Sequence, residues 1–278
     1  MPNWVTNIIE VSGKKEDIDA LMQRVRSEES GFDFNTLIPM PESLNVTSGG
    51  STPVAILYYI SNRLERPINE IRQHKFSSSA HLFSTLETEI ARLRDGINNG
   101  YYKPDKLYAD GKVYVDNLEK YGAPTWYEWA NKNWGTKWNA CDVDVSRNSP
   151  TSCSICFDTA WSLPEPIIIK LVEEYPQLDF DGKWADEDLG SNCGHWESCD
   201  GVPVFTDVET LRFACEVWGY DYDEIRSEYG YDEDEEEEPA PIEVEVEEVA
   251  EIEDIPCSID ELIEASHSVL NEHGGDMR

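Results

Sequence analysis

Clustered cysteines are the residues in this sequence best suited to chemistry. Cys153 and Cys156 form one C-x2-C pair, and Cys193 and Cys199 lie about 40 residues further on, with His195 between them. Zinc takes four sulfur or nitrogen ligands, so two such pairs that converge across a sheet would form a structural zinc site. Positions three apart on a regular strand point to opposite faces, and the second spacing is loose. Reduced cysteines without metal are the alternative interpretation, and a disulfide is a third.

Aromatic side chains offer a second kind of candidate site. Five of them could form a platform on which nucleic-acid bases stack: Trp126, Tyr127, Trp129, Trp134 and Trp138. Only Lys132 and Lys137 supply positive charge in this stretch, so packing within the fold is the favoured interpretation. The sequence contains no glycine-rich phosphate loop, Gly-x-Ser-x-Gly turn or His-Glu-x-x-His helix. We therefore expect no enzymatic activity and no cofactor apart from the possible zinc.

Acidic residues dominate the composition. The chain of 278 residues has 57 Asp and Glu against 22 Lys and Arg, a net charge of −35 at pH 7. Such a charge excludes unaided binding to nucleic acid or to an anionic membrane, because both need a cationic surface. Residues 221–278 contain 23 acidic and 2 basic residues, a net −21, and residues 1–220 contain the remaining 34 and 20, a net −14. The body of the protein is therefore acidic in its own right.

The C-terminal region combines acid runs with an apolar stripe. We expect residues 221–256 to be a low-complexity linker without structure of its own, and residues 257–278 to contain a helix that Ser258 and Glu261 cap. Its acids would contact a basic partner, and the apolar stripe of the helix would dock on the same partner. The predicted partner-binding residues are Asp232, Glu233, Asp234, Glu235, Glu236, Glu237, Glu238, Glu243, Glu245, Glu247, Leu262, Ile263, Val269 and Leu270.

Hydrophobic periodicity predicts the elements that would position these groups. The expected strands are 3–11, 32–35, 137–146, 152–161, 178–185 and 193–198, and the expected helices are 14–29, 55–64, 82–97, 106–121, 126–134, 164–175 and 207–218. Without the helices in the middle, this order gives an α+β fold: a ferredoxin-like antiparallel sheet with two helices on one face. We thus expect one domain over 1–220 with a helical insertion at about 45–135.

Three stretches resemble a known family. They are MPNWVTNIIEVSG at the N-terminus, FDFNTLIPMPESL together with PTWYEWANKNWGTKWNA, and FDTAWSLPEPII. Over roughly residues 1–205 they resemble the YubB ferredoxin-like family, Api-type proteins that phages and conjugative plasmids encode. The resemblance implies a ferredoxin-like sheet with a helical insertion, and it supplies no catalytic residues. The acidic tail and the clustered cysteines depart from the family pattern.

Two hypotheses for function follow. The first is a non-catalytic acidic binding protein of a phage or plasmid, which inhibits a host defence or nucleic-acid-handling protein by mimicking nucleic acid. The partner would be a host protein with a basic surface, and neither nucleic acid nor a membrane would be bound directly. The alternative is a zinc-stabilised structural or regulatory domain with a solubilising acidic tail. No apolar run is long enough to span a membrane, so we expect the protein in the cytoplasm of a bacterial host.

Overall fold

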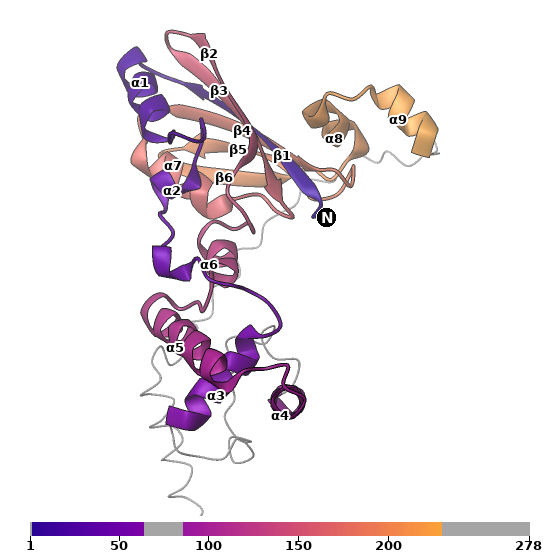
Figure 1. Cartoon of the computed structure of the whole chain (residues 1–278). Helices are drawn as coiled ribbons and strands as arrows, with labels where there is room; N and C mark the ends of the chain where they lie inside the picture. The colour runs from indigo at the N-terminus through magenta and orange to yellow at the C-terminus, as the bar shows by residue number, and fades with distance from the viewer. Residues whose placement is uncertain (1, 64–85, 230–278) are drawn as a thin grey trace, which may run out of the picture. The chain divides into compact units, whose positions relative to one another are not determined.

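The computed structural model describes residues 2–63 and 86–229 (Figure 1). These residues divide into two compact units, one formed by residues 2–40 with 130–229 and the other by residues 41–63 with 86–129. The predicted partner-binding residues of the C-terminal region lie outside the described residues. The predicted sites that can be placed in the structure therefore belong to the body of the protein.

A six-stranded antiparallel sheet forms the centre of the first unit. Its strand order is β2-β3-β1-β4-β5-β6. The strands are β1 (Trp4–Ser12), β2 (Cys141–Ser149), β3 (Ser152–Ala160), β4 (Asp179–Asp186), β5 (Cys193–Cys199) and β6 (Val202–Asp207). The helices of this unit are α1 (Lys15–Arg24), α2 (Phe34–Leu37), α7 (Glu165–Glu174), α8 (Leu211–Trp218) and α9 (Tyr222–Tyr229).

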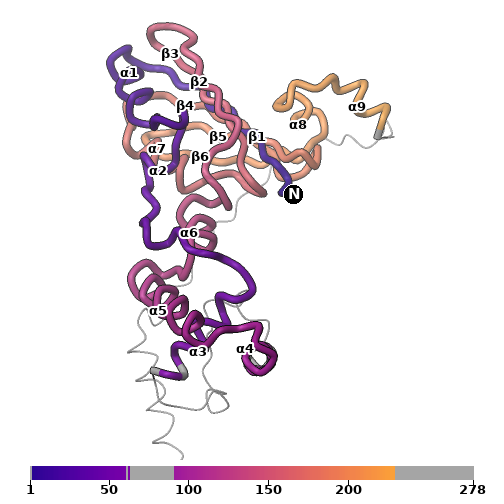
Figure 2. The backbone as a smooth tube through the Cα atoms, in the orientation of Figure 1, coloured from indigo at the N-terminus to yellow at the C-terminus, as the bar shows by residue number. Residues whose placement is uncertain are grey.

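The order β1-α1-β2-β3-α7-β4, with β1 and β3 side by side in the sheet, is the ferredoxin-like arrangement. The predicted fold class is thus confirmed, with α1 and α7 on one face of the sheet (Figure 1). Strand β5 continues the sheet beyond β4, and β6 extends it by one more strand. The backbone can be followed through these strands in Figure 2. The second unit interrupts the ferredoxin-like order between α1 and β2.

Alternation of side chains along the strands produces the covered face of the sheet. Val5, Ile9 and Val11 of β1 are buried, and their partners on β3 are the buried residues Thr159, Ile155 and Cys153. The apolar stripes of α1 and α7 supply the opposing layer, including Leu21 and Leu171. A two-residue period therefore separates the side chains that hold the fold together from those that face the other way.

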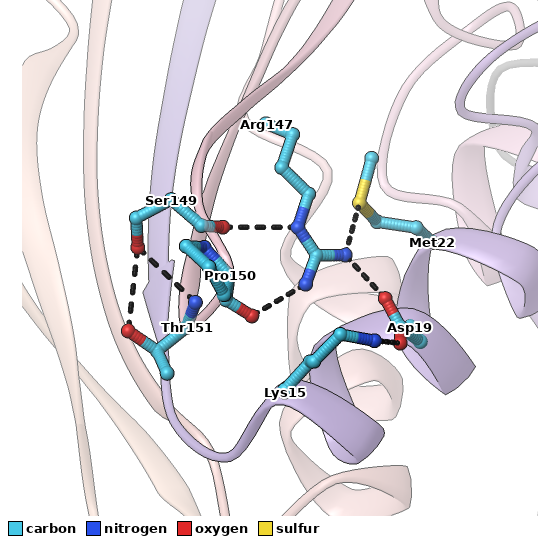
Figure 3. A network of polar contacts seen from close by, with 7 residues as sticks. All are labelled: Lys15, Asp19, Met22, Arg147, Ser149, Pro150 and Thr151. Carbon is cyan, nitrogen blue, oxygen red and sulfur yellow. Dashed lines mark hydrogen bonds and ion pairs between the residues drawn. The ribbon is translucent and has the colours of Figure 1, made fainter.

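An ion pair joins the end of β2 to α1, next to the turn between β2 and β3 (Figure 3). The Arg147 guanidinium donates to Asp19 of α1 at 2.5 Å, and Lys15 pairs with the same carboxylate at 2.5 Å. Arg147 also donates to the backbone carbonyls of Ser149 and Pro150, which close the loop. The hydrogen bonds from Lys15 and Arg147 hold the pKa of Asp19 below its ordinary value. Arg147 therefore has a structural role, because its guanidinium joins α1 to the end of β2.

Several predicted elements differ from the observed ones. Residues 32–35 were expected to be a strand, but α2 begins at Phe34 because the Asp33 carboxylate caps it and accepts from the Asn35 amide. The β6 strand was not expected, since Pro203 weakens the strand pattern, yet a proline is tolerated on an edge strand. Helix α9 lies at the start of the expected linker, so residues 222–229 are a correction to that prediction.

The second unit is helical, as the insertion was predicted to be. It contains η1 (Glu42–Leu44), α3 (Thr52–Arg63), α4 (Leu86–Asn98) and α5 (Pro104–Tyr121), and α6 (Trp126–Asn133) begins in it. Its core includes Val54, Leu93, Leu107 and Val115. Gly111 allows α5 to approach α3 closely, because a Cβ there would overlap the Ala55 carbonyl. This core is separate from the covered face of the sheet.

Candidate functional site

The structure does not bring the four predicted zinc ligands together. Cys153 is buried on the covered face, and Cys156, three positions along β3, lies on the other face. Cys193 and Cys199 occupy the two ends of β5, where one is buried and the other is exposed. Among residues 2–63 and 86–229 there is no group of three or more His, Cys, Asp or Glu side chains that could hold a metal ion.

The chemistry of these thiols also argues for inert side chains. Burial raises the pKa of Cys153 and of Cys193 above the ordinary value, and the neighbouring charge of Asp144 adds to the same effect at Cys156. A thiol with a raised pKa stays protonated at neutral pH, whereas metal binding and nucleophilic attack need the thiolate. The observed surroundings fit the interpretation of reduced cysteines.

The aromatic run contributes to packing. Trp129 and Trp134 are buried at 6% and 4% exposure. The Trp134 indole packs edge-on against Phe34 and donates to the Ile38 carbonyl at 2.9 Å. Trp138 lies against Trp4 with the ring centroids 6.0 Å apart. These contacts favour the packing interpretation over a base-stacking platform.

The second face of the sheet, which we call the open face, carries side chains of a different kind. Helix α8 covers one end of it, where Ala214 and Val217 pack against Ala185 and Cys193. Elsewhere the open face presents polar and acidic residues from five strands, together with exposed valines on β6. They are Asp144, Ser146, Ser154, Cys156, Asp158, Thr6, Glu10, Asp181, Glu197, Val202 and Val204.

Three carboxylates form a line across the middle of the open face. Glu10 on β1 is directly opposite Asp181 on β4, and Asp181 is directly opposite Glu197 on β5. All three side chains are exposed. We call Glu10, Asp181 and Glu197 the carboxylate row. Neighbouring strands are about 4.8 Å apart, so the row places three negative charges within about 10 Å.

Little in the fold neutralises the carboxylate row. Glu10 accepts from Ser154 at 2.9 Å and from Asn148 at 3.2 Å, both neutral donors. Asp181 and Glu197 show no hydrogen-bond or ion-pair partner within the part of the chain that the structure describes. Like charges directly opposite each other on neighbouring strands destabilise a sheet. We therefore expect the row to lower the stability of the fold slightly.

Further acids continue the open face toward the other edge of the sheet. Asp144 on β2 is exposed, and Asp158 on β3 is half-buried and accepts from the Thr6 hydroxyl at 2.7 Å. Burial raises the pKa of Asp158, and the charges of Asp142 and Glu187 raise it further. Asp144 and Asp158 thus extend the acidic surface from the carboxylate row to β2 and β3.

Among the described residues, acidic side chains outnumber the basic Lys183 and the neighbouring His195 on the open face, so this face can accept hydrogen bonds and attract cations. Its one lysine, Lys183, is paired with Glu216 of α8 at 2.6 Å. Sequence reasoning missed the carboxylate row, since its members lie at positions 10, 181 and 197. The available signal was local: each acid is followed or preceded by buried apolar residues in a strand, as in Ile9-Glu10-Val11. That signal predicts a solvent-facing side chain, and only strand register shows that the three meet.

No helix in the described ranges is both long and apolar enough to cross a membrane. By fold and site, the first unit is a ferredoxin-like domain with an acidic sheet face, of which the described helices cover one end. Comparison with known families adds a match over residues 133–238 to the model of the ferredoxin-like domain in Api92-like protein. This range contains β2 to β6 and α7 to α9, and it confirms the Api-type resemblance for that part of the chain.

Other comparisons add less. A crystal structure of the protein api92 from Yersinia pseudotuberculosis matches over 75% of this chain and 99% of that chain. The two are 8% identical in sequence, with a TM-score of 0.36, a likeness too low to support an argument. No curated protein matches the sequence.

Proposed function

We propose that this protein is a non-catalytic acidic binding protein, encoded by a phage or plasmid, that inhibits a host protein with a basic surface. The partner would belong to host defence or nucleic-acid handling, and the acidic protein would occupy a groove meant for DNA or RNA. The observation that carries the proposal is the carboxylate row on the open face, Glu10, Asp181 and Glu197.

Long-range electrostatics support this proposal. A net charge of −35 attracts a basic partner before contact and raises the association rate, as complementary potentials do in other complexes. The same charge repels nucleic acid and anionic lipid. The open face adds a fixed pattern to this diffuse attraction, because its carboxylates are held on a rigid sheet rather than on a loop.

The acidic C-terminal region would add to the same interaction. The runs from Asp232 to Glu238 and from Glu243 to Glu247 supply further negative charge, and the predicted helix would supply apolar anchors. We place the interaction in the cytoplasm of the bacterial host, where the thiols remain reduced. No observation on the described residues favours a zinc-stabilised domain.

Capture from a host lysate tests the proposal. The bait is the full chain, compared with a variant in which Glu10→Gln, Asp181→Asn and Glu197→Gln neutralise the carboxylate row. We expect the full chain to retain a basic nucleic-acid-binding or defence protein. Duplex DNA or RNA should displace this protein from the bait. The variant should retain at least tenfold less of it. Retention should also fall steeply between 50 and about 300 mM salt. Equal retention by both baits, unaffected by salt or nucleic acid, would overturn the proposal.

A further inference from the structure

A small pocket lies where α8 meets the open face. Its volume is about 160 Å³, and its lining comes from β1, β4 and α8: Ile8, Glu10, Asp181, Lys183, Glu216 and Val217. Sites for cofactors and drug-sized ligands usually measure about 300–1,000 Å³. This pocket is thus too small for a nucleotide or a cofactor and is of a size for one long side chain.

The lining of the pocket combines apolar and acidic groups. Ile8 and Val217 belong to the apolar cluster beneath α8, and Val217 is only 6% exposed. Glu10, Asp181 and Glu216 bring three negative charges against the single positive charge of Lys183, a net −2. Lys183 already donates to Glu216 at 2.6 Å, whereas Asp181 shows no partner in the described ranges. The pocket therefore places the uncompensated negative charge of Asp181 beside the apolar side chains of Ile8 and Val217.

We infer that this pocket receives a lysine or arginine side chain of the protein partner. The aliphatic stem would pack on Ile8 and Val217 while the cationic head reaches Asp181 and Glu10, as long basic side chains do when they cover apolar surface. The inference rests on the proposed function and names the anchor residue that the open face would bind. A second copy of this chain is a poor occupant, because two chains of net −35 repel each other.

Charge complementarity selects this occupant over others. An acidic side chain or a phosphate would meet Glu10, Asp181 and Glu216 at the rim, and an apolar side chain would leave their charge uncompensated. The chain's own Lys183 shows the favourable arrangement, since it reaches along the same surface to Glu216. A basic side chain is the group that satisfies both the apolar wall and the acidic rim.

Titration followed by NMR tests the inference on the isotope-labelled full chain. The probes are acetyl-arginine amide, acetyl-lysine amide and the uncharged analogue acetyl-citrulline amide. We expect the two cationic probes to shift the backbone signals of Ile8, Asp181 and Val217 saturably, and the citrulline probe to shift them at least fivefold less. Equal shifts with citrulline, or shifts spread evenly over acids throughout the chain, would overturn the inference.

Variants separate the pocket from general charge attraction. Asp181→Asn should weaken arginine binding about threefold to fivefold, while Glu173→Gln on the exposed face of α7 should leave it unchanged. Ile8→Phe keeps every charge and fills the pocket, so it should weaken binding at least fivefold; Val217→Met serves the same purpose should Ile8→Phe fail to fold. If both filled variants fold and bind arginine normally, the inference is wrong. The proposed function would survive that result, because the filled variants keep every charge of the carboxylate row and lysate capture tests those charges.

Discussion

The two faces of the sheet differ in composition although their residues alternate along the same strands. On the covered face β1 contributes Val5, Ile9 and Val11, which are almost completely buried. On the open face the same strand contributes Thr6 and Glu10, which are polar and partly or fully exposed. The covered face gains free energy from burial, whereas the open face concentrates unneutralised charge. The difference separates the side chains that stabilise the fold from those available for binding.

The largest expected effect comes from removing a large side chain from the covered face. Phe157 is 1% exposed and packs against Phe32 and Phe34, with ring centroids 4.9 and 5.9 Å away. Phe157→Ala should lower the free energy of unfolding by about 3–5 kcal/mol, measured by urea denaturation. Asp144→Ala on the open face is the control and should change it by less than about 0.5 kcal/mol. Similar losses at both positions would mean that the two faces do not differ as described.

A smaller effect is expected at Gly182, which faces the covered side of β4. A Cβ at this position would overlap the indole of Trp196, which is 1% exposed and has little room to move. Gly182→Ala should therefore destabilise the protein by about 1–3 kcal/mol in the same denaturation measurement. Asp181→Ala, one residue earlier on the open face, is the matched control. A tolerated Gly182→Ala would show that the packing under the sheet is looser than the contacts indicate.

Neutralising the carboxylate row should stabilise the fold slightly. The variant with Glu10→Gln, Asp181→Asn and Glu197→Gln removes repulsion between directly opposed charges. We expect about 0.5–1 kcal/mol of added stability at low ionic strength, and less in high salt. Thermal unfolding at two salt concentrations measures both quantities. A loss of stability would indicate that the row supports the fold rather than binding.

The smallest expected effect concerns the pH dependence of Asp158. Burial, with the charges of Asp142 and Glu187, raises its pKa in the folded protein, so the folded state binds this proton more tightly than the unfolded state does. The contribution of Asp158 to the free energy of unfolding therefore increases as the pH falls through the raised pKa. Above that pKa the ionised carboxylate destabilises the folded state. Compared with Asp158→Asn, the wild type should gain stability as the pH is lowered from neutrality. A constant difference over that range would contradict the assignment.

Much of the fold could be predicted from the sequence, because the period of apolar residues reflects burial directly. The alternation in residues 3–11 and the helical spacing of residues 164–175 predicted β1 and α7. The predictions failed where local chemistry outweighed the pattern: Asp33 caps α2 in place of an expected strand, and Pro203 concealed β6. The expected linker was shortened by α9, which follows directly after α8.

The candidate site was harder to predict than the fold. Glu10 and Asp181 are 171 positions apart, and the registers of β1–β4 and β4–β5 bring them into line with Glu197. Composition gave the net charge of −35 but could not locate it on a surface. The spacing of the cysteines predicted a zinc site. In the structure, Cys153 and Cys156 lie on opposite faces of β3, and Cys193 and Cys199 lie at opposite ends of β5. Residue types alone therefore did not identify the residues of the candidate site, whereas the strand register shows which of them lie together.

Covalent labelling of carboxyl groups tests the central claim most directly. The protein would be treated with a carbodiimide and glycine ethyl ester, alone and in complex with the basic host protein that it captures, and labelling would be quantified by mass spectrometry. We predict that Glu10, Asp181 and Glu197 are labelled when free and at least fivefold less in the complex, while Glu173 on α7 is labelled equally in both. Unchanged labelling of the carboxylate row in the complex would contradict the claim that the open face binds the partner.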